Sequence, residues 1–268
     1  MQSWLELGQL KMSKGACIIA SNSGDLDYIG LAAINAKLIR KHLSIPVCLL
    51  TTDIDYHPDF DKVVVIDDRP SSKRSMLKGN THITYEWKND QRIEAIHYSP
   101  WDRTLLLDAD YIVMSDLLQP LLACDQPFMI ADRVYDVTGR NSFKHLKLLP
   151  DKSIKQRWAT VMCFNKQAQP IFDATAMVRK DYSYYAAMFD WPNRPFRNDF
   201  AFTIAAHLLG VPQFPITMAQ LSPDCEVEAD AKGLKISYAN NVMRWRGDLH
   251  VLNKSIALDP SKLGALHE

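Results

Sequence analysis

Residues 103–113 read RTLLLDADYIV. An apolar run that ends abruptly at polar residues is typical of a strand buried inside a sheet, so a strand is expected over Arg103–Leu107. Asp108 and Asp110 follow this strand at once, and apolar residues resume after them. Because a buried carboxylate without a partner is costly, the pattern indicates a polar site at the end of the strand.

Strands and helices alternate on both sides of this segment. Strands are expected at Ala16–Ser21, Val47–Thr51 and Lys62–Ile66, and helices at Tyr28–Leu43, Glu86–Tyr98 and Leu117–Ala123. This alternation favours an α/β fold with a mostly parallel sheet that is flanked by helices on both faces. Ligands bind at the carboxyl ends of such strands. Polar clusters follow the expected strands at 22–25, 52–53, 67–68 and 108–110.

The second half of the chain has a less regular pattern. A strand is expected at Trp158–Asn165, helices at Pro170–Asp181 and Asp199–Leu209, a packed loop at Tyr182–Pro195, and short strands and loops over 211–250. No internal repeat or linker divides the sequence, which favours a single domain over residues 15–260. Residues 1–14 are expected to be an N-terminal extension, with Met12 as an alternative start.

The composition excludes several classes of protein. The 268 residues carry 31 Lys+Arg and 31 Asp+Glu, a formal net charge of zero, and 47% of them are hydrophobic. Such a chain is globular; it is not disordered, not a coiled coil, and not a protein whose whole surface binds nucleic acid. The five cysteines form no CxxC pair, so neither a zinc ribbon nor a disulfide framework is expected. Because the sequence shows neither a run of ~20 apolar residues nor a signal peptide, a cytoplasmic protein is expected.

Two motifs far apart in the sequence carry potential metal ligands. Asp108 and Asp110 can turn toward one point if the strand ends in a bend, and hard oxygen ligands of this kind suit Mg²⁺ or Mn²⁺ holding a diphosphate. The second motif is GDLHVLNK at residues 247–254. In it the neutral imidazole of His250 can complete the set, and the charge of Lys254 can reach a phosphate. The alternatives are carboxylates that cap a turn and a histidine that is satisfied in the core.

The order of these motifs resembles that of nucleotide-sugar glycosyltransferases with the GT-A fold. The resemblance rests on Asn22–Tyr28, LLLDADYIV (105–113), WATVMCFN (158–165), Arg197–Asp199 and GDLHVLNK. Within that fold the chain is most similar to the retaining glycogenin-like and bacterial lipopolysaccharide galactosyltransferase-like enzymes. The layout matches over residues 15–255, whereas identity is confined to these short motifs.

The resemblance implies a complete donor site. It implies a nucleotide-sugar half at 15–115, an acceptor half at 116–260, a UDP-sugar donor and a Mn²⁺ (or Mg²⁺) cofactor. The implied metal ligands are Asp108, Asp110 and His250. The implied donor contacts are Ser21, Asn22, Tyr28, Arg92, Asp108, Ala109 and Lys254, with Tyr28 stacking on the uracil and Lys254 holding the diphosphate.

The chain also resembles glycosyltransferase-like proteins of large tailed phages, which share LLLDxD, WATVM and RND with it. Such phages decorate hydroxymethylated pyrimidines of their own DNA with sugars from UDP donors. The resemblance therefore implies a 5-hydroxymethylpyrimidine in DNA as the acceptor and the host cytoplasm as the location. The chain departs from the glycogenin-like pattern at Trp158–Thr160, where relatives carry Asn-Ser/Ala-Gly, and at Asn198–Asp199, where they carry Asp-Gln.

A basic segment follows the Asp108–Asp110 motif. Residues 133–157 hold seven basic and two acidic side chains, a net charge of +5 in a chain whose net charge is zero. The aromatic residues in and beside this segment, Tyr135, Phe143 and Trp158, can stack on a displaced base. The candidate acceptor contacts are Arg133, Arg140, Lys144 and Trp158. The alternatives are a solvated loop and a saccharide acceptor, which also uses aromatic platforms.

The expected reaction is transfer of a sugar from UDP to an acceptor hydroxyl, with retention of configuration as the leading hypothesis. A divalent ion and Lys254 stabilise the charge that develops on the departing diphosphate. Asp199, with Arg197 and Asn198, is the candidate that orients the sugar or the acceptor; the alternative is a helix cap. A saccharide-acceptor glycosyltransferase of cell-surface glycan synthesis and a non-catalytic sugar-nucleotide-binding scaffold remain as alternative functions. The absence of GxGxxG and GxxxxGK[ST] argues against a dehydrogenase and a P-loop enzyme.

Overall fold

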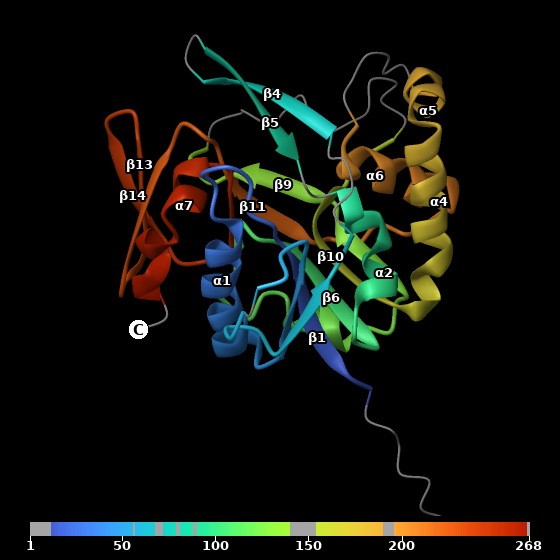
Figure 1. Cartoon of the computed structure of the whole chain (residues 1–268), viewed down its shortest axis with the longest axis horizontal. Coiled ribbons are helices and arrows are strands. Elements are labelled where there is room, and N and C mark those ends of the chain that lie inside the picture. The colour runs from blue at the N-terminus through green and yellow to red at the C-terminus, as the bar shows by residue number, and fades with distance from the viewer. Residues whose placement is uncertain are drawn as a thin grey trace, which may run out of the picture.

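The centre of the molecule is a six-stranded sheet. The computed structural model describes residues 12–55, 57–67, 72–78, 81–87, 90–139, 154–189 and 196–266. The sheet contains β1 (Lys14–Ile19), β2 (Val47–Thr51), β3 (Lys62–Val65), β6 (Arg103–Asp108), β8 (Phe128–Ala131) and β10 (Trp158–Asn165). Their order is β3-β2-β1-β6-β10-β8, and only β10 runs against its neighbours. Figure 1 labels β1, β6 and β10 of this sheet, which are neighbours in it. This confirms the expected α/β class with a mostly parallel sheet.

Helices cover both faces of this sheet. Its inner strands are mostly apolar because successive side chains point to opposite faces and both faces are buried, whereas the edge strand β3 is largely exposed. Leu107 shares one hydrophobic core with α1 (Tyr28–Leu43), whereas its neighbour Leu106 shares the other with α4 (Gln169–Lys180) and α6 (Asn198–Leu208). The carboxyl end of β6 therefore emerges between the two helical layers.

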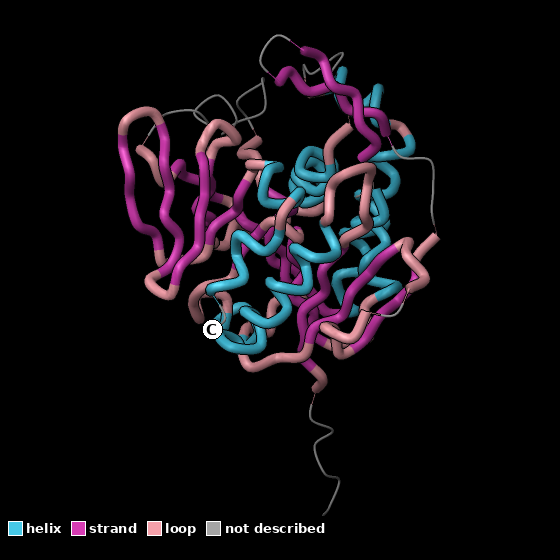
Figure 2. Tube along the Cα trace, turned by 60° about the vertical axis from the view of Figure 1, so that its left-hand side comes forward, coloured by secondary structure: helices cyan, strands magenta, loops and turns pink. Residues whose placement is uncertain are grey.

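A second sheet continues from the carboxyl end of β6. It contains β7 (Tyr111–Ile112), β9 (Arg133–Asp136), β11 (Thr217–Leu221) and β15 (Leu249–Val251) in the order β7-β15-β11-β9. Three antiparallel strands, β12 (Glu226–Asp230), β13 (Gly233–Tyr238) and β14 (Asn241–Trp245), form a separate sheet. The hairpin of β4 (Ser72–Lys78) and β5 (Thr81–Trp87) is the remaining one. Figure 2 shows the three-stranded sheet and the hairpin at different edges of the molecule.

Short helices complete the described part of the chain. They are η1 (Asp90–Glu94), α2 (Ala95–Tyr98), α3 (Gln119–Ala123), η3 (Lys166–Ala168), α5 (Tyr182–Met188), α7 (Lys254–Leu258) and η4 (Pro260–Leu266). Among the residues that the structure describes, no helix combines the length and the apolar character that a membrane crossing requires.

Two sequence predictions of secondary structure were wrong in part. The helix expected at Glu86–Tyr98 begins only at Asp90, because Glu86 and Trp87 end strand β5. The packed loop expected at Tyr182–Pro195 begins with helix α5, whose seven residues contain no proline. Both prolines of this segment lie after the helix and so do not interrupt it.

Candidate metal centre

The two acidic residues of the motif lie on either side of a bend. Asp108 is the last residue of β6, where it pairs with Ile19 of β1. The chain then turns away from the central sheet, and the next strand, β7, belongs to the second sheet. Asp110 lies in this turn, so the strand ends in the bend that the i, i+2 spacing requires if both carboxylates are to face one point.

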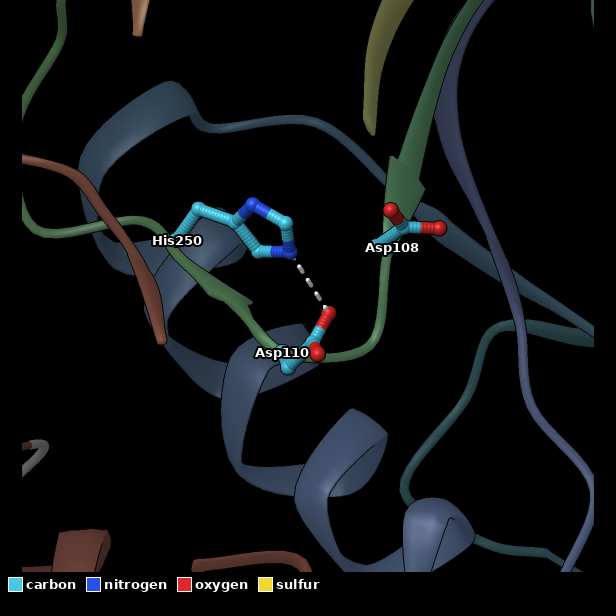
Figure 3. Close-up of side chains that lie close together, drawn as sticks. All are labelled: Asp108, Asp110 and His250. Carbon is cyan, nitrogen blue, oxygen red and sulfur yellow. Dashed lines mark ion pairs between the residues drawn. The ribbon is translucent and has the colours of Figure 1, made fainter. Parts of the chain in front are cut away.

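Strand pairing brings His250 to the same bend. β15 runs antiparallel to β7 with His250 opposite Tyr111, and Val251 N donates to Asp110 O at 2.8 Å. His250 Nε2 lies 3.3 Å from Asp110 Oδ1, and the ring points at that carboxylate (Figure 3). One ligand atom each from Asp108, Asp110 and His250 lie within 4.8 Å of one another. The predicted metal ligands are thus gathered from positions about 140 residues apart in the chain.

Two buried side chains that the sequence analysis did not single out hold the bend in place. Asn35, on the buried side of α1, donates from Nδ2 to Tyr111 O at 2.7 Å and accepts from Val113 N at 3.1 Å. Asp248 Oδ1 accepts from Met114 N and from the hydroxyl of Ser115, both at 2.8 Å. Asn35 had a sequence signal, since it is the one amide among the apolar residues that face the sheet from this helix.

Lys254 contributes a cation to the centre. It is the first residue of α7, and its Nζ donates to Asp110 Oδ2 at 3.0 Å. Burial by itself would lower the pKa of Lys254, but Asp110 beside it raises that pKa well above its usual value. Burial would likewise raise the pKa of Asp110, but Lys254 and His250 outweigh it and hold that pKa well below its usual range. Asp110 is therefore an ionised carboxylate with a charged partner.

Arg92 pairs with the other carboxylate. Its side chain in η1 is 1% exposed, and Nη1 donates to Asp108 Oδ1 at 2.7 Å. Nη2 donates to the carbonyl oxygen of Thr160 on β10 at 3.2 Å. The sequence resemblance assigned Arg92 to the donor, whereas in this structure its guanidinium fixes Asp108 against the neighbouring strand. A buried charge pair of this kind needs such extra hydrogen bonds to be tolerated.

The residues fit a divalent cation. Two carboxylates and one imidazole are ligands that Mn²⁺ and related ions accept in proteins. Ligand atoms about 2.0–2.2 Å from an ion lie at most about 4.4 Å apart, so small side-chain rotations suffice to close the observed 4.8 Å group. The charges of Asp108 and Asp110 are paired with those of Arg92 and Lys254.

The expected nucleotide contacts lie in the loop that follows β1. Ser21 Oγ accepts from Thr52 N at 3.0 Å, and Asn22 Oδ1 accepts from Ile29 N at 3.0 Å, so both side chains shape the loop before α1. Tyr28 begins α1, and the Lys254 ammonium lies 5.4 Å from its ring centroid. Ala109 is buried inside the bend. The structure thus brings this loop next to the metal centre.

The residues Arg197, Asn198 and Asp199 lie at the start of α6. Asp199 Oδ1 accepts from Ala159 N of β10 at 2.8 Å, and Oδ2 is 3.2 Å from Arg197 Nη2. The carboxylate therefore contacts a neighbouring strand, and the N-cap residue of α6, Arg197, makes no side-chain cap hydrogen bond. Asn198 is buried. Ala159 is next to Thr160, whose carbonyl oxygen binds Arg92 of the metal centre. This cluster therefore lies at the same edge of the sheet as the metal centre.

Several side chains in or beside the basic segment are buried or engaged within the protein, which leaves fewer of them for an acceptor than the sequence suggests. Trp158 is 6% exposed and packs into the core on one face of the sheet, so the prediction that it stacks on an acceptor base was wrong. Lys155 pairs with Asp132 at 3.3 Å, and Arg157 donates to two backbone carbonyls. Arg133 is exposed on β9. The other two candidates, Arg140 and Lys144, lie outside the described residues.

Known structures with a similar fold include glycosyltransferases. The galactosyltransferase LgtC, in complex with donor and acceptor sugar analogs, is 15% identical over 82% of this chain and 74% of its own, with a TM-score of 0.48. GlyE of Streptococcus pneumoniae TIGR4 is 14% identical over 77% and 45% (TM-score 0.45), and mouse xyloside xylosyltransferase 1 is 11% identical over 82% and 86% (TM-score 0.43). No family model and no curated protein matches the sequence. Similarity at this level leaves reaction and substrates to be argued from the chain's own residues.

Proposed function

We propose that the chain is a GT-A glycosyltransferase that uses a divalent cation to move a sugar from a UDP-sugar to an acceptor hydroxyl. One observation carries the proposal: Asp108, Asp110 and His250 converge at the carboxyl end of β6, with Lys254 and Tyr28 beside them. A carboxylate-imidazole group next to a buried ammonium suits a metal diphosphate, because it offers ligands to the ion and a cation to the phosphates.

Each side chain has a defined part in this proposal. Asp108, Asp110 and His250 would hold Mn²⁺, which when bound acts as a Lewis acid toward the leaving diphosphate. Arg92 keeps Asp108 oriented through its two hydrogen bonds. Lys254, which pairs with Asp110 in the structure, would turn to the diphosphate and stabilise the charge that develops there.

For the sugar and the acceptor hydroxyl we propose the cluster at the start of α6. Both carboxylate oxygens of Asp199 are engaged, one with Ala159 N and one with Arg197, which suits an orienting group better than a proton acceptor. This arrangement supports retention, in which the departing phosphate takes the hydroxyl proton. A product anomer inverted relative to the donor, read by proton NMR, would contradict that part of the proposal.

The acceptor that we propose is the hydroxyl of a 5-hydroxymethylpyrimidine in DNA, on the strength of the +5 charge of residues 133–157. The test is mass spectrometry after incubation with Mn²⁺, a panel of UDP-sugars, and either hydroxymethylated DNA, plain DNA or oligosaccharides. A mass increase of one hexose, pentose or N-acetylhexosamine only on hydroxymethylated DNA supports the proposal. Transfer only to oligosaccharides would show that the acceptor is a saccharide and not DNA, and would leave the proposed UDP-sugar donor unchanged.

A non-catalytic sugar-nucleotide-binding scaffold is the second candidate. It is favoured by the charge balance of the centre, since Arg92 and Lys254 already neutralise both carboxylates. The two candidates differ in UDP release: an enzyme releases UDP from a UDP-sugar slowly even without acceptor, and Asp110→Asn stops that release. If no UDP-sugar yields UDP in the presence of Mn²⁺ while binding persists, the chain is a scaffold.

A further inference from the structure

Gln220 contacts the side of the His250 ring that faces away from Asp110, and it has no part in the function proposed above. It lies on β11, which pairs in parallel with β15 so that Gln220 and His250 are register partners. Both side chains are buried, and Gln220 Oε1 lies 3.3 Å from His250 Nδ1. Because partner residues on neighbouring strands point to the same face of a sheet, the amide and the imidazole are held side by side by the backbone.

The contact determines which nitrogen of His250 can bind a metal. Nδ1 carries a hydrogen when it donates to an amide oxygen, and Nε2 then keeps its lone pair. Nε2 is the nitrogen that faces Asp110, at 3.3 Å from Oδ1. A metal-binding histidine needs its second nitrogen fixed by such an acceptor, since this sets both the tautomer and the ring orientation.

We propose that Gln220 is a positioning residue that presents Nε2 of His250 to the divalent cation. The inference rests on the metal centre of the proposed function and adds a residue to it. Metal-binding histidines usually donate to a carboxylate, a backbone carbonyl or water. A neutral amide orients the ring equally well but adds no negative charge, so the imidazole is a weaker ligand than one backed by a carboxylate. An ion held in this way exchanges more readily.

Two substitutions with opposite expected effects test the proposal. Gln220→Met removes the acceptor at similar volume, and Gln220→Glu replaces it with a carboxylate. Mn²⁺ affinity is measured by electron paramagnetic resonance at constant pH, and pulsed measurements on the bound ion report the ¹⁴N coupling of a coordinated imidazole. We expect Gln220→Met to weaken binding about tenfold or more and to lose the ¹⁴N coupling. Gln220→Glu is expected to keep the coupling and to bind at least as tightly as the natural protein.

A matched control is Gln156→Met, which removes the amide of another buried glutamine, on the loop before β10, and is expected to leave Mn²⁺ affinity unchanged. The proposal is overturned if Gln220→Met binds within twofold of the natural protein with its ¹⁴N coupling intact, or if Gln220→Glu binds as weakly as Gln220→Met. Should Gln220→Met not fold, Gln220→Glu decides alone: weakened binding overturns the proposal and equal or tighter binding supports it. If the natural protein binds no Mn²⁺, the metal centre itself is refuted, and the proposed function with it.

Discussion

Lys254→Met tests whether the Lys254 ammonium competes with the divalent cation for Asp110. In the structure Lys254 Nζ holds Asp110 Oδ2 at 3.0 Å, with side chains that are 29% and 13% exposed. The gross attraction of such a pair is about 5 kcal/mol at an effective dielectric constant of 20. Desolvation of both ions offsets most of it, and roughly 1.5 kcal/mol of net stabilisation remains, the lower end for a hydrogen bond to a charged group. A cation that takes Asp110 must displace this contact, so Lys254 opposes metal binding until a phosphate offers the ammonium another partner.

The expected result is a change of opposite sign in two measurements. Without nucleotide, Lys254→Met should bind Mn²⁺ roughly tenfold more tightly, because about 1.4 kcal/mol of competition is removed. With UDP-sugar, UDP release should fall by about two orders of magnitude or more, since the cation facing the diphosphate is lost. Lys262→Met, at an exposed lysine in η4, serves as the control and should change neither quantity. Weaker or unchanged Mn²⁺ binding by Lys254→Met would refute the competition, and unchanged UDP release would refute the phosphate role.

Three further predictions concern the scaffold around the centre. Asn35→Leu should lower the free energy of unfolding by roughly 2–4 kcal/mol in urea denaturation, because Tyr111 O and Val113 N lose their side-chain partner inside the core; a loss below 0.5 kcal/mol would show that the bend is held without it. Trp158→Ala should lower the free energy of unfolding by roughly 3–5 kcal/mol in the same assay, as expected for a core residue. A nearly unchanged free energy of unfolding would show that Trp158 is not part of the core. Cys163 is fully buried and burial raises its pKa to about 11, so iodoacetamide should leave it unmodified at pH 8 in the folded protein; mass spectrometry that finds Cys163 labelled as fast as a free thiol at pH 8 contradicts this.

The local parts of the fold were predictable from the sequence. Val47–Thr51, Trp158–Asn165 and Tyr28–Leu43 have the bounds that their patterns predicted, because each is a buried element whose apolar residues mark it from end to end. The convergence of Asp108 and Asp110 was also predictable, since it follows from a strand that stops at a bend.

His250 could be named as a ligand from its chemistry and from the resemblance, but the strand pairing that brings it to the centre was not predictable. His250 reaches Asp110 because β15 pairs with the two-residue strand β7, and a strand so short leaves no periodic pattern. Gln220 and Asn35 act through register and helix orientation, which are properties of the assembled sheet. Proximity in sequence is misleading at Trp158: it adjoins a basic segment, yet it begins a strand that is covered on both faces and is therefore a core residue.

The most direct test of the proposed function is calorimetric titration of UDP into the natural protein and into Asp110→Ala, each with and without Mn²⁺. The account predicts that UDP binds the natural protein much more tightly when Mn²⁺ is present and that Asp110→Ala loses this dependence on the metal. If UDP binds Asp110→Ala with the same metal dependence as the natural protein, Asp108, Asp110 and His250 are not the metal centre of a nucleotide-sugar site.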